Sequence, residues 1–282
     1  MNFSNPQAEV FLPDHSETLS ALERTTDLCI AAHHDDIEIM AYGPIATCFH
    51  DPKRFFTGCV VCDGAGSPRK GAYAGYTDEE MMDTRIKEQK NAARIGRYAA
   101  QVLLGLPSAQ IKDPCDKSAV DDLEQLLLAT LPQAVYTHNL ADKHDTHVAV
   151  TLRVIEAIRR LPAEKRPAKV YSMEVWRGLD WLCDGDKTTF DTSLYPSLAG
   201  ALLGVFDSQV SGGKRYDSAA IGRRLANSTF FASHKTDSCD SLSYALDITA
   251  LVDDCSMKPE AFIKSYIERF EAEVLAKIQN LQ

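Results

Sequence analysis

The sequence predicts an α/β protein: a three-layer, Rossmann-like fold around a mostly parallel sheet. Short apolar segments alternate with longer segments of helical periodicity up to about residue 176. Strands that alternate with helices are typical of βαβ crossovers, which make neighbouring strands parallel. Clusters of polar residues directly follow two of the expected strands. Because open parallel sheets bind ligands beyond the carboxyl ends of their strands, we expect a metal or substrate site at that edge.

The strands are expected where short apolar runs occur, at 27–32, 55–61, 101–106, 133–138 and 168–176. The helices between them are expected where apolar residues recur with helical spacing, at 37–49, 78–100, 119–131 and 147–161. The segment 78–100 also begins with acidic residues and ends with basic ones, which suits the helix dipole. Each expected helix thus lies between two expected strands, which is the alternation from which the fold is predicted.

After Trp176 the alternation weakens, and the remaining pattern predicts helices at 194–206, 218–231 and 259–279. No internal repeat and no low-complexity linker separates this part from the rest. We therefore expect a single domain over residues 1–282, with a core of about 25–210 and a C-terminal helical extension of about 211–282.

The composition excludes several classes of function. The 282 residues include 30 Lys and Arg against 40 Asp and Glu, a net charge of −10, so nucleic acid is not an expected partner. No apolar run approaches the roughly 18 residues of a membrane span, and the first residues lack a signal-peptide pattern. Eight scattered cysteines suit a reducing compartment, and the Cys59–Cys62 pair is read as core. We expect a cytoplasmic protein without a membrane partner.

Two clusters of histidines follow expected strands and can meet at one edge of the sheet. The first contains His33 and His34 in "HHDD", and the second lies in "HNLADKHDTH" and contains His138, His144 and His147. More than a hundred residues separate the clusters, but the carboxyl ends of parallel strands lie together. The two clusters therefore predict one shared site.

A metal ion is the simplest reason for such a shared site. Catalytic zinc usually has three protein ligands from His, Asp or Glu and one open position. His33 and Asp36 lie close enough in one turn to bind the same ion. His144 and His147, spaced i, i+3 at a helix start, can each supply the third ligand. Taken alone, "HHDD" is more often a polar turn and helix start than a metal site, because Asp caps helices well, and only its pairing with the second cluster favours a metal.

These motifs resemble those of a known family. "AHHDDIE" (32–38) resembles the AHPDDxE signature of the PIG-L/LmbE-like zinc-dependent N-deacetylases, and "HNLADKHDTHVAV" (138–150) resembles their HNxxDxHPDHxAV signature. "RIKEQKNAARIG" (85–96) and "ALLGVFDSQ" (201–209) resemble the RxxExxxAAxxLG and ALxxYxSQ segments. The resemblance covers about residues 25–210, and its paired His-Asp motifs are the specific part.

The resemblance implies a division of roles among the matching residues. His33, Asp36 and His147 are implied to bind zinc. Asp35 is implied to be the general base when water attacks an amide carbonyl, and His144 to act as an acid or oxyanion stabiliser. Two histidines and a carboxylate would also hold Fe(II), Co(II) or another divalent ion.

Further residues are expected around these five. The resemblance implies that Arg85 hydrogen-bonds sugar hydroxyls, and Gln209 and His34 are further candidates for substrate contact. The candidates for orienting the ligands are Asp142, His138 and Glu38. Arg85 can equally pair with Glu88 on a solvated helix face. The glycine-rich segment 63–76 lacks a phosphate-loop pattern and is read as a mobile loop over the site edge.

The sequence departs from the family pattern at two places. His34 stands where the family has proline, and in "HDTH" Asp145 and Thr146 replace proline and aspartate. The expected ligands and base are untouched, so the metal site should survive. The replacement of the aspartate by Thr146 affects whatever that aspartate does in the family, such as orienting a ligand or binding substrate.

The expected function is that of a metal-dependent hydrolase that removes an acyl group, chiefly acetyl, from an N-acyl amino sugar or glycoconjugate. One alternative is an amidase acting on another small amide, such as a thiol-sugar conjugate. The other is a non-catalytic module that binds a carbohydrate or a metal. Asp35 favours catalysis, because a binding module needs no base beside an open metal position. A homo-oligomer is compatible with the sequence, which offers no test of it.

Overall fold

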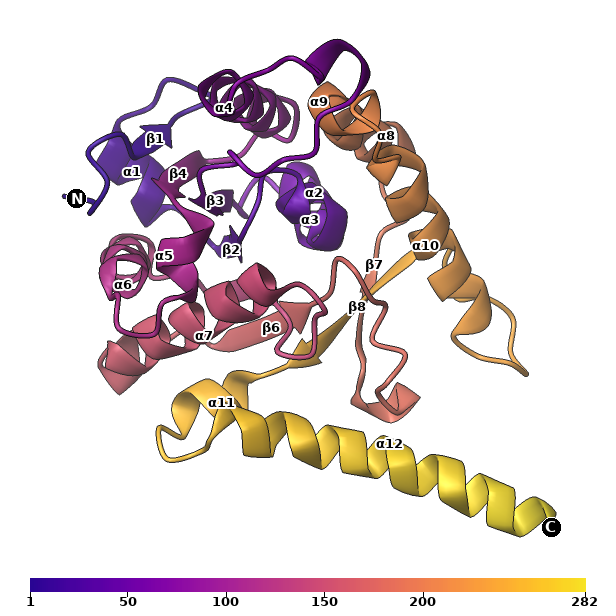
Figure 1. Cartoon of the computed structure of the whole chain (residues 1–282). Helices are drawn as coiled ribbons and strands as arrows, with labels where there is room; N and C mark the ends of the chain where they lie inside the picture. Colours follow the sequence, from indigo (N-terminus) through magenta and orange to yellow (C-terminus); the bar gives the residue numbers. More distant parts are fainter.

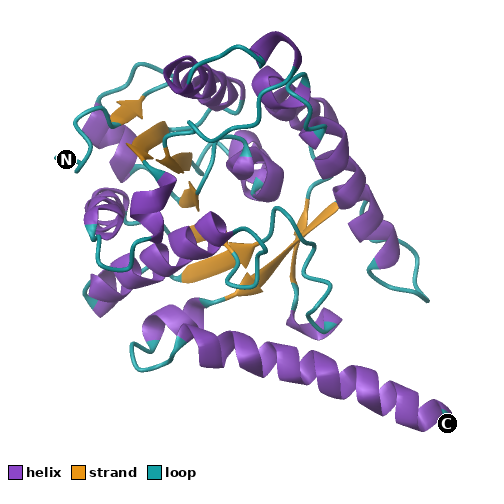
Figure 2. Ribbon diagram, viewed as in Figure 1, coloured by secondary structure: helices purple, strands orange, loops and turns teal.

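The computed structural model describes all 282 residues and has the expected α/β architecture (Figures 1 and 2). Eight strands form one sheet in the order β1-β4-β3-β2-β5-β6-β8-β7. The strands β4, β3, β2, β5 and β6 pair in parallel, whereas β1, β8 and β7 join the two edges antiparallel. The strands are β1 (Glu9–Phe11), β2 (Asp27–Ala31), β3 (Phe56–Cys62), β4 (Ala100–Leu106), β5 (Ala134–His138), β6 (Lys169–Met173), β7 (Thr188–Asp191) and β8 (Leu242–Asp247).

Helices cover both faces of this sheet. Leu28 and Ile30 of β2 face a core that includes side chains of α6 and α7, while the alternate residues Cys29 and Ala31 face a core formed with α2, α3, α4 and α8. The helices are α1 (Thr18–Glu23), α2 (Asp36–Met40), α3 (Tyr42–His50), α4 (Asp78–Ile95), α5 (Ser108–Lys112), α6 (Ser118–Thr130), α7 (Asp145–Arg160), α8 (Pro196–Gly204), α9 (Asp207–Val210), α10 (Tyr216–Phe230), α11 (Thr249–Asp253) and α12 (Pro259–Leu281). The period-2 alternation of the buried strands thus produces the three layers.

The strand order places a switch point between β2 and β5. From β2 the chain moves outward to β3 and β4, whereas from β5 it moves in the opposite direction to β6. Loops that leave the carboxyl ends of two such strands diverge and open a crevice between them. Both histidine clusters leave the sheet at this crevice.

Two expected helices have different bounds in the structure. The segment expected as one helix at 37–49 is divided into α2 and α3 at Ala41. Pro44, which has no N–H to donate, lies in the first turn of α3, where that N–H is not needed. The helix expected to reach residue 100 ends at Ile95, and Arg97 adopts a positive φ of 53° before β4 begins.

The segment after residue 210 is not purely helical, which corrects the expected helical extension. Its residues Leu242–Asp247 form β8, which pairs antiparallel with β6 and with β7. Pairing between segments this distant in sequence stabilises β8, so a local pattern does not reveal it. The helices α10 and α12 lie where they were expected, and no helix combines the length and apolar character that crossing a membrane requires. Cys59 and Cys62 are buried, free thiols in β3.

Candidate metal centre and active site

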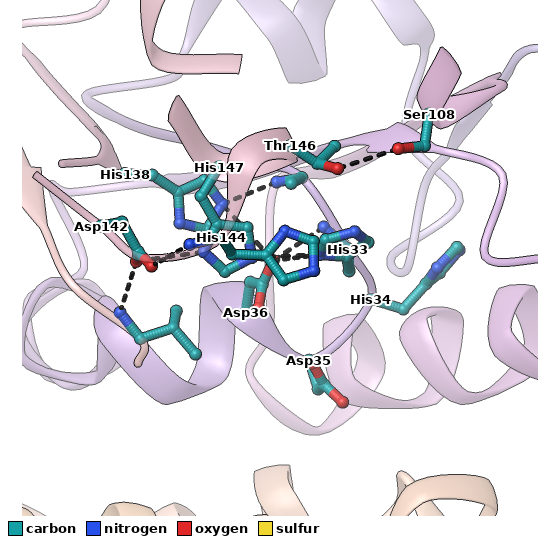
Figure 3. A network of polar contacts seen from close by, with 12 residues as sticks. His33, His34, Asp35, Asp36, Ser108, His138, Asp142, His144, Thr146 and His147 are labelled. Atoms are coloured by element: carbon teal, nitrogen blue, oxygen red, sulfur yellow. Dashed lines mark hydrogen bonds and ion pairs between the residues drawn. The ribbon is translucent and has the colours of Figure 1, made fainter. Parts of the chain in front are cut away.

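The crevice between β2 and β5 brings the two histidine clusters together. His33 follows the end of β2, and Asp36 is the first residue of α2. His138 ends β5, and His144 is the N-cap residue of α7, so His147 lies in the first turn of that helix. Figure 3 shows the four imidazoles gathered around the carboxylate of Asp36.

Three donor atoms converge as metal ligands would. The Nδ1 atom of His33 lies 3.1 Å from Nε2 of His147 and 3.2 Å from Oδ2 of Asp36, and the last two atoms are 3.3 Å apart. Ligands about 2.0–2.1 Å from a tetrahedral zinc ion are about 3.3 Å from one another. The residues His33, Asp36 and His147 therefore fit a divalent cation without rearrangement.

Asp142 contacts the ring nitrogen of His147 that faces away from the converging donor atoms. Oδ2 of Asp142 lies 3.1 Å from Nδ1 of His147, and Oδ1 accepts the backbone N–H of His144 at 3.0 Å. A carboxylate on one ring nitrogen fixes the tautomer and leaves the other nitrogen free for a metal. Burial opposes protonation of His147, but Asp36 and Asp142 together raise its pKa to about 9. Asp142 therefore lies on the side of His147 that faces away from His33 and Asp36.

His138 and His144 are alternative ligands by proximity alone. Donor atoms of Asp36, His138 and His147 lie close enough to hold an ion, and so do those of His33, His144 and His147. However, Nε2 of His138 accepts the backbone N–H of Ala32 at 2.8 Å, so its lone pair is occupied. The ring of His138 also stacks on His147 with centroids 3.9 Å apart, which suits a supporting role.

Asp35 lies next to Asp36 in the sequence, and its backbone is strained. Its φ of 80° is in the left-handed region, which Asp tolerates better than most residues, and its N–H donates to Oε1 of Gln89 at 3.2 Å. Burial raises the pKa of Asp35 to about 6, while the nearby guanidinium of Arg85 works in the opposite direction. A carboxylate with a pKa close to neutrality can accept and return a proton.

Arg85 is held in place rather than free on the helix surface. Its guanidinium lies 2.9 Å from Oδ2 of Asp35 and 3.2 Å from Oε2 of Glu88, and it also donates to the carbonyl of His34. Glu88 in turn accepts the N–H and hydroxyl of Ser208 at 2.6 and 2.7 Å. The pair with Glu88 exists, but both side chains are buried, so the solvated-face alternative is wrong. Arg85 lines the pocket with most of its donors already engaged.

His34 does not lie where a substrate contact was expected. It is 1% exposed and is absent from the pocket lining, because its ring packs against the backbone of Gly64. A Cβ at Gly64 would approach Nδ1 of His34 to 3.0 Å, and Gly64 also has a φ of 85°. His34 therefore fills the space beneath the glycine-rich loop, and burial lowers its pKa well below the usual range.

Glu38 supports the site from beneath. It is fully buried, and its Oε1 accepts the hydroxyl of Tyr98 at 2.8 Å and the amide of Gln89 at 2.9 Å. Because Gln89 also accepts the N–H of Asp35, a chain of hydrogen bonds runs from Tyr98 to the candidate base. Burial raises the pKa of Glu38 to about 7.

A pocket of about 330 Å³ opens over His33, Asp35 and Asp36. Gly64 and the residues after it form one wall, as expected for the glycine-rich segment, and Gln209 lies in another wall. Several other lining residues belong to no motif in the sequence, and these are Ser108, Lys112, Trp176, Lys214 and Tyr216. They come from segments far apart in the chain and form no local motif.

Thr146, which departs from the family pattern, also lines this pocket. Its Oγ1 lies 2.8 Å from Oγ of Ser108, and Thr146 is 2% exposed (Figure 3). Asp145, the other departure, is exposed at the start of α7. The missing aspartate is therefore replaced by a neutral pair of hydroxyl groups in the pocket wall.

Comparisons with known proteins agree with this geometry. Residues 28–158 match the sequence model of the family described as PIG-L, GlcNAc-PI de-N-acetylase. No curated protein gives a significant sequence match to the chain.

Solved structures share the fold at low sequence identity. N,N'-diacetylchitobiose deacetylase from Pyrococcus horikoshii has a TM-score of 0.64 at 15% identity, over 80% of this chain and 85% of its own. The 4-carboxy-2-hydroxymuconate hydratase GalB from Pseudomonas putida has a TM-score of 0.61 at 18% identity, over 79% and 96%. A conserved protein from Thermus thermophilus has a TM-score of 0.62 at 16% identity, over 79% and 94%.

At these identities the structural likenesses establish the fold, and the match in sequence shows which family the first part of the chain resembles. The matched segment contains both histidine clusters together with Asp35, Asp36 and Arg85. Residues 28–158 are thus similar to the PIG-L family, and this similarity includes every residue that converges in the candidate site except the lining residues beyond 158.

Proposed function

We propose that the protein is a metal-dependent hydrolase that removes an acyl group, chiefly acetyl, from an N-acyl amino sugar or glycoconjugate. The observation that carries this proposal is the convergence of His33, Asp36 and His147 beside Asp35 at the base of one pocket. The match of residues 28–158 to a family described as a de-N-acetylase supports the reaction type. A deacetylase with this fold, which acts on diacetylchitobiose by its name, supports the amino-sugar class.

His33, Asp36 and His147 would hold the ion, which we assign as Zn²⁺, although Fe(II) or Co(II) would satisfy the same donors. When bound, such an ion lowers the pKa of water and polarises a carbonyl oxygen. Asp36 suits its place because His147, His138 and His33 hold its pKa well below the usual range despite burial. It therefore remains an anion and cannot serve as the base.

Asp35 is the group that moves the proton. Hydrolysis adds the hydroxyl of water to the amide carbon and a proton to the departing nitrogen, so one group must collect and return that proton. Asp35 lines the pocket, and only one of its oxygens is held by Arg85. Arg85 thus orients the carboxylate while the second oxygen faces the reaction. We propose orientation of Asp35 as the main task of Arg85, ahead of binding a sugar hydroxyl.

His144 is placed to stabilise charge on the carbonyl oxygen or to protonate the amine. Its ring lies 5.0 Å from that of His33, between centroids, and it lines the pocket with Nδ1 unpaired. Burial, followed by the proximity of His147 and His33, lowers the pKa of His144. A neutral imidazole donates one hydrogen bond without repelling the neighbouring cation.

The walls of the pocket suit a polar ring compound. Trp176 presents its ring near His144 and Tyr216, with centroids 6.4 and 6.0 Å away, while Gln209 adds a polar side chain to the lining. Aromatic faces beside hydrogen-bonding groups are typical of small-molecule sites. The amine and acyl group remain open, and an amide of a thiol-sugar conjugate is the alternative substrate within the same chemistry.

A screen of N-acetylated amino sugars, with separate detection of free amine and acetate, tests this function. We expect equal amounts of both products, produced only by metal-loaded protein. Measuring both products matters because one structural relative is a hydratase, which would consume a substrate without releasing an amine. Metal binding without turnover on any amide would favour a non-catalytic carbohydrate- or metal-binding module. Cytoplasmic location remains a prediction, and a homo-oligomer remains open.

A further inference from the structure

A second, smaller cavity lies behind the wall of the metal pocket. It has a volume of about 30 Å³ and lies between α10, the end of α2 and the segment after β6. Its wall includes three arginines, Arg177, Arg223 and Arg224. A cavity this size accommodates one or two particles the size of water. So many cations around one small space are unexpected in a chain with a net charge of −10.

Arg224 is a buried cation without a carboxylate partner. It is 4% exposed, and its Nη2 donates to the backbone carbonyls of Glu38 and Ile39 at 2.6 and 2.9 Å. Its Nε and Nη1 atoms have no hydrogen-bond partner. The ring of Tyr42, 4.7 Å from the guanidinium carbon, provides the only other compensation. Burying a cation without a counter-charge is costly, and burial lowers the pKa of Arg224 to about 10.

The other groups in the cavity wall do not supply this counter-charge. Arg223 donates to the carbonyls of Val175 and Arg177 at 2.5 and 3.1 Å and forms no ion pair. Glu174 is the single carboxylate in the wall, and its two oxygens accept the N–H groups of Leu179 and Trp181 at 2.7 and 3.0 Å. Burial raises the pKa of Glu174 to about 7, so it carries only part of a negative charge at neutral pH.

We propose that this cavity binds a small monovalent anion of the size of chloride, which Arg224 holds through Nε and Nη1. Arg223 and Arg177 add positive charge on the side of the segment that follows β6. The anion would join α10 to that segment, whose residues Val175 and Trp176 line the metal pocket on their other side. Binding therefore stabilises the wall of the candidate active site, and this inference does not depend on the reaction proposed above.

The first test is the thermal midpoint of the full chain as chloride replaces gluconate at constant ionic strength. Gluconate is too large for the cavity, so it serves as the reference anion. Chloride at ten times its dissociation constant should raise the midpoint by roughly 2 °C. Equal midpoints in chloride and in gluconate would overturn the proposal.

Three variants separate this site from general salt effects. Arg224→Met should abolish the response to chloride, and Ala220→Leu, which fills the cavity and leaves all three arginines, should abolish it too. Arg159→Met is the matched control, because Arg159 also donates to backbone carbonyls but lies away from the cavity. It should retain the full response. A response that survives in Arg224→Met contradicts the assignment.

The second test locates the ion directly. Crystals grown in bromide should show an anomalous scattering peak within hydrogen-bond distance of Nε and Nη1 of Arg224. A water molecule at that position, or bromide found only elsewhere, would overturn the proposal even if chloride stabilised the protein.

Discussion

Asp142→Asn tests whether His147 is a metal ligand that a neighbouring carboxylate orients. Asp142 is 7% exposed, and its Oδ2 faces Nδ1 of His147 at 3.1 Å. Asparagine preserves the volume, and its carbonyl can still accept the N–H of His144. However, its amide N–H₂ would face Nδ1, which favours the tautomer that carries the proton on Nε2. That tautomer has no lone pair for the ion.

Loss of such an orienting group typically lowers metal affinity about 10–100-fold, which is about 1.4–2.7 kcal/mol. The dissociation constant for Zn²⁺, measured by competition with a chromophoric chelator, should rise by that factor. Asp145→Asn is the control, since this carboxylate is three residues away, exposed and without a hydrogen-bond partner in the site. A dissociation constant within twofold of the wild type for Asp142→Asn would refute the reasoning.

Two further predictions concern stability. Gly64→Ala should destabilise the protein by about 1–3 kcal/mol, because its φ is 85° and a Cβ would approach His34 to 3.0 Å. Gly66→Ala, where nothing lies within 4 Å, should change the chemical-denaturation midpoint little, and equal effects of the two substitutions would contradict this account. Glu174 has a pKa raised from 4.5 to about 7, so the folded state binds its proton more tightly than the unfolded state does. The contribution of Glu174 to the free energy of unfolding should fall by about 3 kcal/mol as the pH rises from about 4.5 to 7. The difference in the free energy of unfolding between wild type and Glu174→Gln, measured by chemical denaturation, should therefore shrink over this pH range. If the free energies of the two proteins changed in parallel with pH, the pKa of Glu174 would not be raised.

The sequence predicted the parts of the fold that depend on local patterns. Strands such as 27–32 and 133–138 could be predicted because burial on both faces of the sheet requires a continuous apolar run. The helix at 147–161 could be predicted because burial of one face imposes a period of 3.6 residues. β8 was missed because its stability comes from pairing with β6, which is distant in sequence. The break between α2 and α3 could not be predicted from apolar spacing, because that spacing continues across the break. Pro44 is the local signal of the break, since proline is favoured in the first turn of a helix.

The same distinction applies to the candidate site. Convergence of His33 and His147 could be predicted, since both follow strands whose ends meet in any parallel sheet. The i, i+3 pair of Arg85 with Glu88 could also be predicted, but its burial and its contact with Ser208 could not, because they join α4 to α9, which are distant in sequence. His34 was assigned to the pocket from its place in the motif. Its burial against Gly64 depends on a loop conformation that the motif does not encode.

Asp35→Asn, assayed with the metal loaded, tests the central claim most directly. Asparagine tolerates the positive φ of this position and can still accept a hydrogen bond from Arg85, but it cannot take a proton. The variant should keep about one divalent ion per chain by elemental analysis. It should also lose about 10²–10⁴-fold in the rate of amine release from the best N-acetyl amino sugar. Unchanged turnover with the ion bound would contradict the proposed mechanism.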